Sequence, residues 1–103
     1  MNTLEILKAA RALLTPPEAW AKNDFAFDSS GNLLAPSNKY AVSWCATGAC
    51  IRAGGKLAAI AAARELSRQL GGREVFDFND RDETTHADVL QLFDDTIARL
   101  ERA

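Results

Sequence analysis

Three residues of this chain, Cys45, His86 and Asn79, have the side chains of a cysteine hydrolase triad. In such a site Cys45 would be the nucleophile, His86 its general base and Asn79 the group that orients the imidazole. The setting of Cys45 opposes this arrangement, because it is predicted inside an apolar helix, where burial raises the pKa of a thiol. His86 is predicted in the first turn of the last helix, where a lone histidine is usually a surface residue. We therefore predict no catalytic residue and keep these three as the candidates of an alternative, enzymatic interpretation.

The spacing of the possible metal ligands is unfavourable. Asp77, Asn79 and Arg81 would take the first, third and fifth positions of a calcium loop, but an arginine cannot bind the ion and no glycine follows at the sixth. Two cysteines and one histidine so placed are too few ligands for zinc. The Gly54-Gly55-Lys56 segment lacks the preceding strand and the spacing of a phosphate-binding loop. The sequence predicts no metal and no cofactor.

The segment that must position Cys45 runs from Tyr40 to Ile51 and contains no charged residue. At helical spacing its bulky side chains surround the whole axis, which predicts a helix over about 39–53 that is buried on all sides. Cys45 and Cys50 would point to different faces of this helix, so we expect two unpaired, buried thiols. Gly48 would let another backbone or an aromatic ring approach the helix closely.

Helical segments are predicted on both sides of this central helix. Asn2 and Glu5 form a capping-box pattern at the start of the first one. Gly71-Gly72 is a typical end for another, and Thr84 or Thr85 would cap the last. The predicted helical segments are 2–14, a short one near 16–20, 56–70, and from 84 or 85 towards the C-terminus.

Two further segments have short-period patterns. Phe25-Ala26-Phe27 and Leu33-Leu34 flank a turn-forming stretch around Gly31, which predicts a small β-hairpin or ordered loop near 25–34. Val75 to Phe78 alternates and predicts an extended, strand-like piece. The expected fold is therefore mainly α, a single helical domain over residues 1–103. It is a compact bundle of four to five helices around the buried central helix of about 39–53.

Composition limits the class of protein. The chain has 103 residues, 48% of them hydrophobic and 25% charged, which is typical of one globular domain with its own core. A formal net charge of −2 is too small for a protein that binds nucleic acid by neutralising phosphates. No apolar run approaches the roughly 18 residues of a membrane helix, and Glu5 and Lys8 interrupt any signal-peptide pattern. We expect a cytoplasmic protein with neither a membrane nor a nucleic acid as its partner.

Acidic residues gather late in the chain, with seven carboxylates and one arginine between Asp77 and Asp95. Acidic residues near a helix N-terminus and Arg99 and Arg102 near its C-terminus match the helix macrodipole, which is a purely structural explanation. The same acidic residues would also suit the basic surface of a partner. Both explanations remain open at the level of sequence.

The sequence resembles an uncharacterised family, a domain of unknown function found in small bacterial and phage proteins. The resemblance rests on the Trp44-Cys45-Ala46-Thr47-Gly48-Ala49 and Phe78-Asn79-Asp80 motifs. A threonine that opens a helix reading Asp88-Val89-Leu90-x-x-Phe93 supports it further. The resemblance implies no established activity. It implies a cluster of recurring residues, here Trp44, Cys45, Gly48, Ala49, Asn79, Asp80 and Thr84.

We predict that the Asn79-Asp80 turn docks against the middle of the central helix. Its side chains would satisfy polar groups near Trp44 and Gly48, because buried polar groups need hydrogen-bond partners. The motif would then be structural first, holding the last helix against the core.

For function we expect a small non-enzymatic protein that binds a protein partner or its own copy. In a phage, the resemblance makes an accessory or host-defence-inhibiting role the expectation. The surfaces to test are the acidic region 77–95 and the tip of the hairpin, 28–32. The candidate binding residues are Trp44, Asn79, Asp80, Asp82, Glu83 and Asp88. The alternative is a small enzyme or ligand-binding protein that uses Cys45, His86, Asn79 and Asp80.

Overall fold

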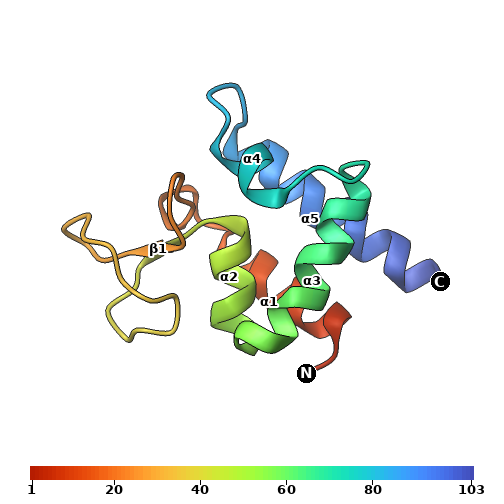
Figure 1. Cartoon of the computed structure of the whole chain (residues 1–103), viewed down its shortest axis with the longest axis horizontal. Helices are drawn as coiled ribbons and strands as arrows, with labels where there is room; N and C mark the ends of the chain where they lie inside the picture. The colour runs from red at the N-terminus through yellow and green to blue at the C-terminus, as the bar shows by residue number, and fades with distance from the viewer.

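The computed structural model describes residues 1–103, and helices dominate it (Figure 1). The predicted mainly-α bundle with a small β element is confirmed. In chain order the elements are α1 (Thr3–Leu13), the 3-10 turn η1 (Pro17–Ala19), β1 (Ala26–Phe27), β2 (Ser43–Trp44), α2 (Ala46–Gly54), α3 (Lys56–Gln69), α4 (Val75–Asp80) and α5 (His86–Arg102). The sheet and its loops lie at one end of the molecule and the end of α5 at the other (Figure 1).

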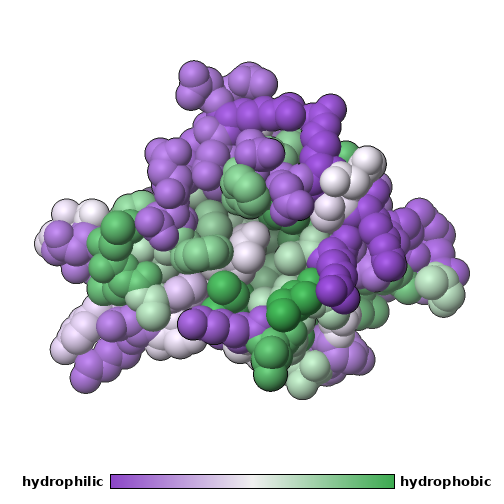
Figure 2. All heavy atoms as spheres, viewed as in Figure 1, coloured by the Kyte–Doolittle hydropathy of each residue, from purple (hydrophilic) through white to green (hydrophobic).

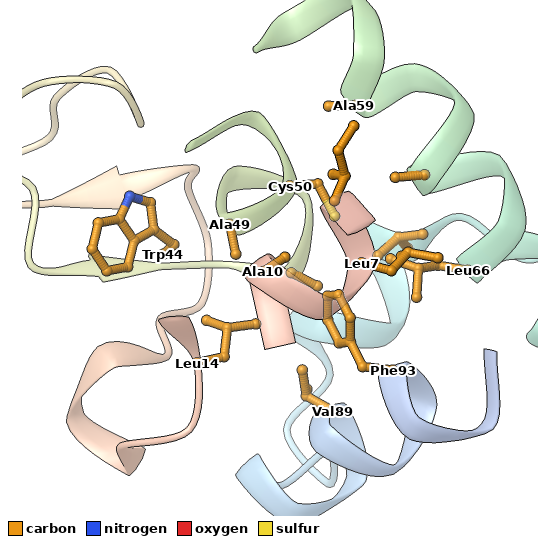
Figure 3. Close-up of a cluster of buried hydrophobic side chains, with 14 of the residues drawn as sticks. Leu7, Ala10, Leu14, Trp44, Ala49, Cys50, Ala59, Leu66, Val89 and Phe93 are labelled. Atoms are coloured by element: carbon orange, nitrogen blue, oxygen red, sulfur yellow. The ribbon is translucent and has the colours of Figure 1, made fainter. Parts of the chain in front are cut away.

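Helix α1 occupies the middle of the bundle and packs against α2, α3 and α5. Its start follows from the predicted capping box: the Asn2 side chain accepts from the Glu5 amide at 2.8 Å, and the Glu5 carboxylate accepts from the Asn2 amide at 2.9 Å. Its apolar stripe faces Cys50 of α2, Leu66 of α3 and Phe93 of α5 (Figure 3). The fully buried members of this stripe are Ile6, Leu7 and Ala10, continued by Leu14.

The helix predicted to be central is α2; α1 takes the central place instead, and α2 starts later than the sequence predicts. It begins at Ala46 instead of about 39, and Ser43-Trp44 forms the antiparallel partner of Ala26-Phe27. In the N-terminal half of the uncharged segment, Tyr40 and Val42 are 64% and 49% exposed, whereas Ala41, Trp44 and Cys45 are buried, so this half is only partly buried. Absence of charge marks burial but does not distinguish a buried strand from a buried helix, which is why the pattern overextended the helix.

The loop over 25–34 forms largely as predicted. Phe27 and Leu33 make an isolated antiparallel bridge, and the Asp28 amide donates to the Asn32 carbonyl at 2.9 Å. The Asp28 carboxylate accepts from the amides of Ser30 and Asn32, and the hydrogen bond from Asn32 is the main reason that the pKa of Asp28 is lowered. The main strand partner of β1, however, is β2, in a segment that the sequence predicts to be helical.

A second prediction is wrong at Val75–Phe78, which is helical and not extended. These residues open α4, a helix of six residues that ends at Asp80. Its buried positions are Val75 and Asn79, four apart, whereas Phe76 and Asp77 face solvent. An alternation over four residues is too short to distinguish the two-residue period of a strand from the 3.6-residue period of a helix. Packing against α2 and α3 favours the helix here.

The remaining helices end and begin as predicted. Helix α5 starts with a capping box in which the Thr85 hydroxyl accepts from the Asp88 amide and Asp88 accepts from the Thr85 amide. Helix α3 turns Ala59, Ala62 and Leu66 to the core. No helix in the structure combines the length and the apolar composition that crossing a membrane requires.

Candidate functional site

Asn79 is the polar centre of the region that the sequence motifs single out. Its Oδ1 accepts from the Ala46 amide at 3.0 Å and from the Trp20 indole at 2.8 Å. Its Nδ2 donates to the Ala21 carbonyl at 3.0 Å and to Asp80 Oδ1 at 2.9 Å. The side chain is completely buried, and its two donors and two acceptor positions are all used. One amide therefore joins α4 to the first turn of α2 and to the segment after η1.

Asp80 extends this connection towards the surface. Its Oδ1 accepts from the Asn23 amide at 2.8 Å, and Asn23 has a positive φ of 77°. Lys22 donates from its ammonium to the Arg81 carbonyl. The segment 20–24 is thereby held against the C-terminal end of α4.

The predicted docking of the Asn79-Asp80 turn against the central helix is present, with a shifted contact. The hydrogen bond reaches Ala46, the first residue of α2, and not the middle of the helix. Trp44 is buried nearby, but its indole donates to the Pro36 carbonyl at 3.1 Å. Because Ala46 has no earlier helical carbonyl to bind, Asn79 supplies the acceptor that the helix end lacks.

At Gly48 the backbone of Phe25 approaches α2 closely. A Cβ at this position would lie 2.0 Å from the Phe25 carbonyl oxygen and 2.9 Å from its carbon. The same carbonyl accepts from the Cys45 amide at 3.2 Å. The prediction that this glycine permits a close backbone approach is therefore confirmed.

Cys45 lies at the N-cap of α2, not inside a helix as the sequence predicts. Its Sγ accepts from the Gly48 amide at 3.3 Å. Burial still raises the pKa of the Cys45 thiol, against the amides of Gly48 and Thr47, which lower it. Burial raises the pKa of Cys50 to about 12. Both cysteines are unpaired thiols, as expected.

The hydrogen bonds of a triad are not formed among Cys45, His86 and Asn79. His86 Nε2 lies 2.6 Å from the Leu14 carbonyl oxygen, which can only accept, so this nitrogen carries the proton and donates. The imidazole ring sits 6.2 Å from the Trp20 ring, centroid to centroid. The amide of Asn79 is fully used elsewhere. His86 therefore positions the start of α5 against α1.

The acidic residues have mixed roles. Asp88 belongs to the capping box of α5, and Asp94 pairs with Arg11 at 3.0 Å. Asp82 and Glu83 are exposed and take part in no ion pair. Thr84, between this turn and the helix, is buried. No group of three or more acidic, histidine or cysteine side chains is arranged to hold a metal ion.

An open groove lies between α2, α3 and α4, and no pattern in the sequence analysis above predicts it. It consists of a pocket of about 440 Å³ and a neighbouring pocket of about 190 Å³, which share Phe25 and Phe76. Figure 2 shows weakly to strongly apolar residues from the middle of this face down to its lower edge, with hydrophilic residues above and to the right of them. We call this feature the groove; the residues used below are Phe25, Lys56, Ile60, Arg64, Glu74 and Phe76.

One signal could have revealed the groove. Lys56, Ile60, Ala63 and Ser67 follow the helical repeat along α3 and line the groove, beside the separate core stripe. Ile60 follows the buried Ala59 directly but is itself 49% exposed. Ile60 and Ala63 give α3 a second apolar side, and a helix with two apolar sides indicates a second contact surface.

Residues 1–99 match the model of a family of unknown function, DUF6197. The chain belongs to this family. No curated protein and no solved structure matches it. The resemblance to an uncharacterised family is thus confirmed. In this DUF6197 member the two motifs that carried the resemblance meet directly, because Asn79 of one binds Ala46 of the other.

We expect both cysteines of this DUF6197 protein to resist iodoacetamide at neutral pH in the native state and to react in urea. Burial raises both pKa values, so little of the reactive thiolate forms. Mass spectrometry of the alkylated protein measures this site by site. A Thr47→Cys variant is the control, because this neighbouring position is only partly buried and should react quickly. Rapid labelling of native Cys45 would contradict the expectation.

Proposed function

We propose that this protein is a non-enzymatic binding protein and that the groove is the surface that contacts a protein partner. One observation carries the proposal: Phe25, Ile60 and Phe76 are 47%, 49% and 55% exposed and all line the groove. Large apolar side chains that share one exposed site, surrounded by charged residues, mark interaction surfaces in soluble proteins. An accessory or host-defence-inhibiting role in a phage, which the family resemblance suggests, would require only such a surface.

The alternative, a small enzyme or ligand-binding protein that uses Cys45, has weaker support. Cys45 and Asp80 do line the smaller pocket beside Asp24. Burial, however, raises the pKa of the Cys45 thiol, and the two carboxylates raise it further, which is the opposite of what a nucleophile requires. The imidazole of His86 donates to the Leu14 carbonyl and makes no hydrogen bond to this thiol. The acidic surface around Asp82 and Glu83 remains available as an additional contact for a basic partner.

The test is affinity capture from a lysate of the source organism with three immobilised proteins: wild type, Ile60→Glu and Val42→Glu. Ile60 and Val42 are equally exposed at 49%, but Val42 lines neither pocket. We expect the wild type and Val42→Glu to retain the same partner, and Ile60→Glu to lose it, because a carboxylate in an apolar contact is costly. Equal capture by all three proteins would show that the partner does not bind at the groove. Native alkylation of Cys45 with loss of a measured activity would favour the enzymatic alternative.

A further inference from the structure

We infer that the groove receives a segment of a partner protein in which an arginine or lysine side chain adjoins an apolar one. The basic side chain enters the smaller pocket, beside Asp24 and Asp80, and the apolar side chain enters the larger pocket. This inference rests on the proposed function, because it gives the chemistry of the segment that binds the same surface. The charge, the free hydrogen-bonding groups and the size of the smaller pocket support it.

The smaller pocket carries negative charge only. Its lining residues are Asn23, Asp24, Phe25, Cys45, Phe76 and Asp80. Neither of its carboxylates takes part in an ion pair of the chain. Burial raises the pKa of the Cys45 thiol, and the charges of Asp80 and Asp24 raise it further, so both negative charges act within this pocket.

No basic side chain of the protein lines this pocket or pairs with its carboxylates. Lys22 and Arg81 are the basic residues nearest to them in the sequence. The Lys22 ammonium donates to the Arg81 carbonyl and lies 5.4 Å from the centroid of the Trp20 ring. Arg81 is exposed and forms no ion pair. A cation from a partner would therefore be the first to pair with these carboxylates.

Each carboxylate is held through one oxygen and keeps the other free. Asp24 Oδ1 accepts from the Phe25 amide at 2.8 Å. Asp80 Oδ1 accepts from the Asn23 amide at 2.8 Å and from Asn79 Nδ2 at 2.9 Å. The Oδ2 atoms of both aspartates accept from no group of the chain. A guanidinium or ammonium group has several N–H donors, and it would find these acceptors already positioned.

Cys45 is a further polar group of this pocket with unused hydrogen-bonding capacity. It is only 6% exposed, and its Sγ accepts from the Gly48 amide, but its S–H donates to no group. Buried polar groups are generally paired, so an unpaired donor in a pocket wall indicates that its partner comes from outside. A backbone carbonyl of the bound segment can accept from this thiol.

The sizes of the two pockets suit different side chains. The smaller pocket, of about 190 Å³, is below the roughly 300 Å³ at which pockets for whole ligands begin, so it suits one side chain. The larger pocket, of about 440 Å³, is lined by apolar residues such as Ile60 and Val75. Phe25 and Phe76 line both pockets. The apolar stem of a basic side chain can pack on these rings while its cation reaches the carboxylates.

The charges of the larger pocket have both signs and select no partner by themselves. Lys56, Arg64 and Glu74 line this pocket. The Ser67 hydroxyl donates to the Arg73 carbonyl at 2.7 Å, which holds Glu74 beside the turn of α3 that carries Arg64. An acidic segment would meet only like charges in the smaller pocket, and a purely apolar one would remove its carboxylates from water without a partner. The smaller pocket therefore selects a basic segment.

The first experiment is a nuclear magnetic resonance titration of the isotope-labelled full chain at low salt with capped dipeptides. The probes are acetyl-leucyl-arginine amide, acetyl-leucyl-citrulline amide and acetyl-leucyl-glutamate amide; citrulline has the shape of arginine without its charge. We expect the arginine peptide to bind with a dissociation constant of about 1 mM and to shift the amides of residues that line the smaller pocket. It should bind at least about fivefold more tightly than the citrulline peptide, and the glutamate peptide should bind least. Equal binding of the arginine and citrulline peptides, or no shift with the arginine peptide, overturns the inference.

The second experiment repeats the titration with Asp24→Asn and Asp80→Asn. Asparagine keeps a side-chain oxygen for the amide that each aspartate binds, and circular dichroism checks that both variants are folded. Each variant should raise the dissociation constant of the arginine peptide about threefold to fivefold and leave that of the citrulline peptide unchanged. Glu18→Gln is the control, because Glu18 is exposed, forms no ion pair and lines neither pocket. If Glu18→Gln weakens binding as much, the overall charge of the protein is responsible, and the assignment to the pocket is wrong.

The inference and the proposed function fail in different ways. A lysate partner that is lost on Ile60→Glu but retained by the double variant Asp24→Asn, Asp80→Asn overturns the basic segment and leaves groove binding to a protein intact. Capture that is unaffected by Ile60→Glu overturns both. A dimer in sedimentation velocity that Ile60→Glu abolishes would assign the groove to a second copy of the chain and overturn the inference.

Discussion

Replacing Asn79 by alanine should lower the free energy of unfolding by about 3–5 kcal/mol. The substitution leaves the Ala46 amide and the Trp20 indole without their acceptor and the Ala21 carbonyl without its donor. Each buried polar group left without a hydrogen bond costs about 1–3 kcal/mol. Water that enters the vacated space can bind some of these groups and so reduces the total loss of stability. Because domains of this size are stable by only about 5–15 kcal/mol, the loss should be visible as a large shift of the urea midpoint.

Two neighbouring variants act as controls for Asn79→Ala. Asp82→Ala removes an exposed side chain with no ion pair, so its effect should stay within about 0.5 kcal/mol. Asp80→Ala should cost about 1–3 kcal/mol, less than Asn79→Ala, because it releases one donor of the buried Asn79 amide together with the Asn23 amide, which is exposed and can bind water. If Asn79→Ala is no less stable than Asp82→Ala, the buried amide does not hold these segments together.

Gly48→Ala should destabilise the protein by about 2–4 kcal/mol, although glycine to alanine within a helix usually stabilises by about 0.5–1 kcal/mol. The added methyl group would lie 2.0 Å from the Phe25 carbonyl oxygen, so the backbone near Phe25 or α2 itself must move. Movement would also strain the hydrogen bond from the Cys45 amide to that carbonyl. Urea unfolding measures the change in stability.

Thr47→Ala is the matched control for Gly48→Ala, since it alters the adjacent, partly buried position of the same helical turn. It should change stability far less than Gly48→Ala. Phe25 also lines the groove, so Gly48→Ala should in addition alter binding at the groove. A Gly48→Ala variant as stable as the wild type would mean that the close approach of the two backbones is dispensable.

Local signals in the sequence predict the ends of the bundle well. Capping side chains act on amides within three residues of themselves, so the Asn2–Glu5 and Thr85–Asp88 pairs need no tertiary contact to be recognised. The long apolar stripes of α1 and α5 repeat over several turns, which makes their period unambiguous. Both helices form where the sequence predicts them.

The structure of short segments is harder to predict from the sequence, because several secondary structures fit the same short pattern. Trp44 pairs with Ala26 across the sheet, and Cys45 ends the extended stretch by capping α2. That cap depends on the Phe25 carbonyl and on Asn79, which are distant in sequence. Val75–Phe78 likewise becomes helical through its packing on α2 and α3. Tertiary contacts therefore decided both places where the sequence predictions are wrong.

The sequence by itself determined the class of fold, the two capped terminal helices and the unpaired thiols. It predicted that the Asn79 motif docks on the middle of the central helix, and the structure places that contact at the first residue of α2. These features follow from composition and from side chains that act on near neighbours or must be satisfied when buried. Only the tertiary structure decided the start of α2, the helical state of α4 and the groove. A groove forms from residues on separate elements, Phe25, Ile60 and Phe76, whose common exposure depends on how those elements pack.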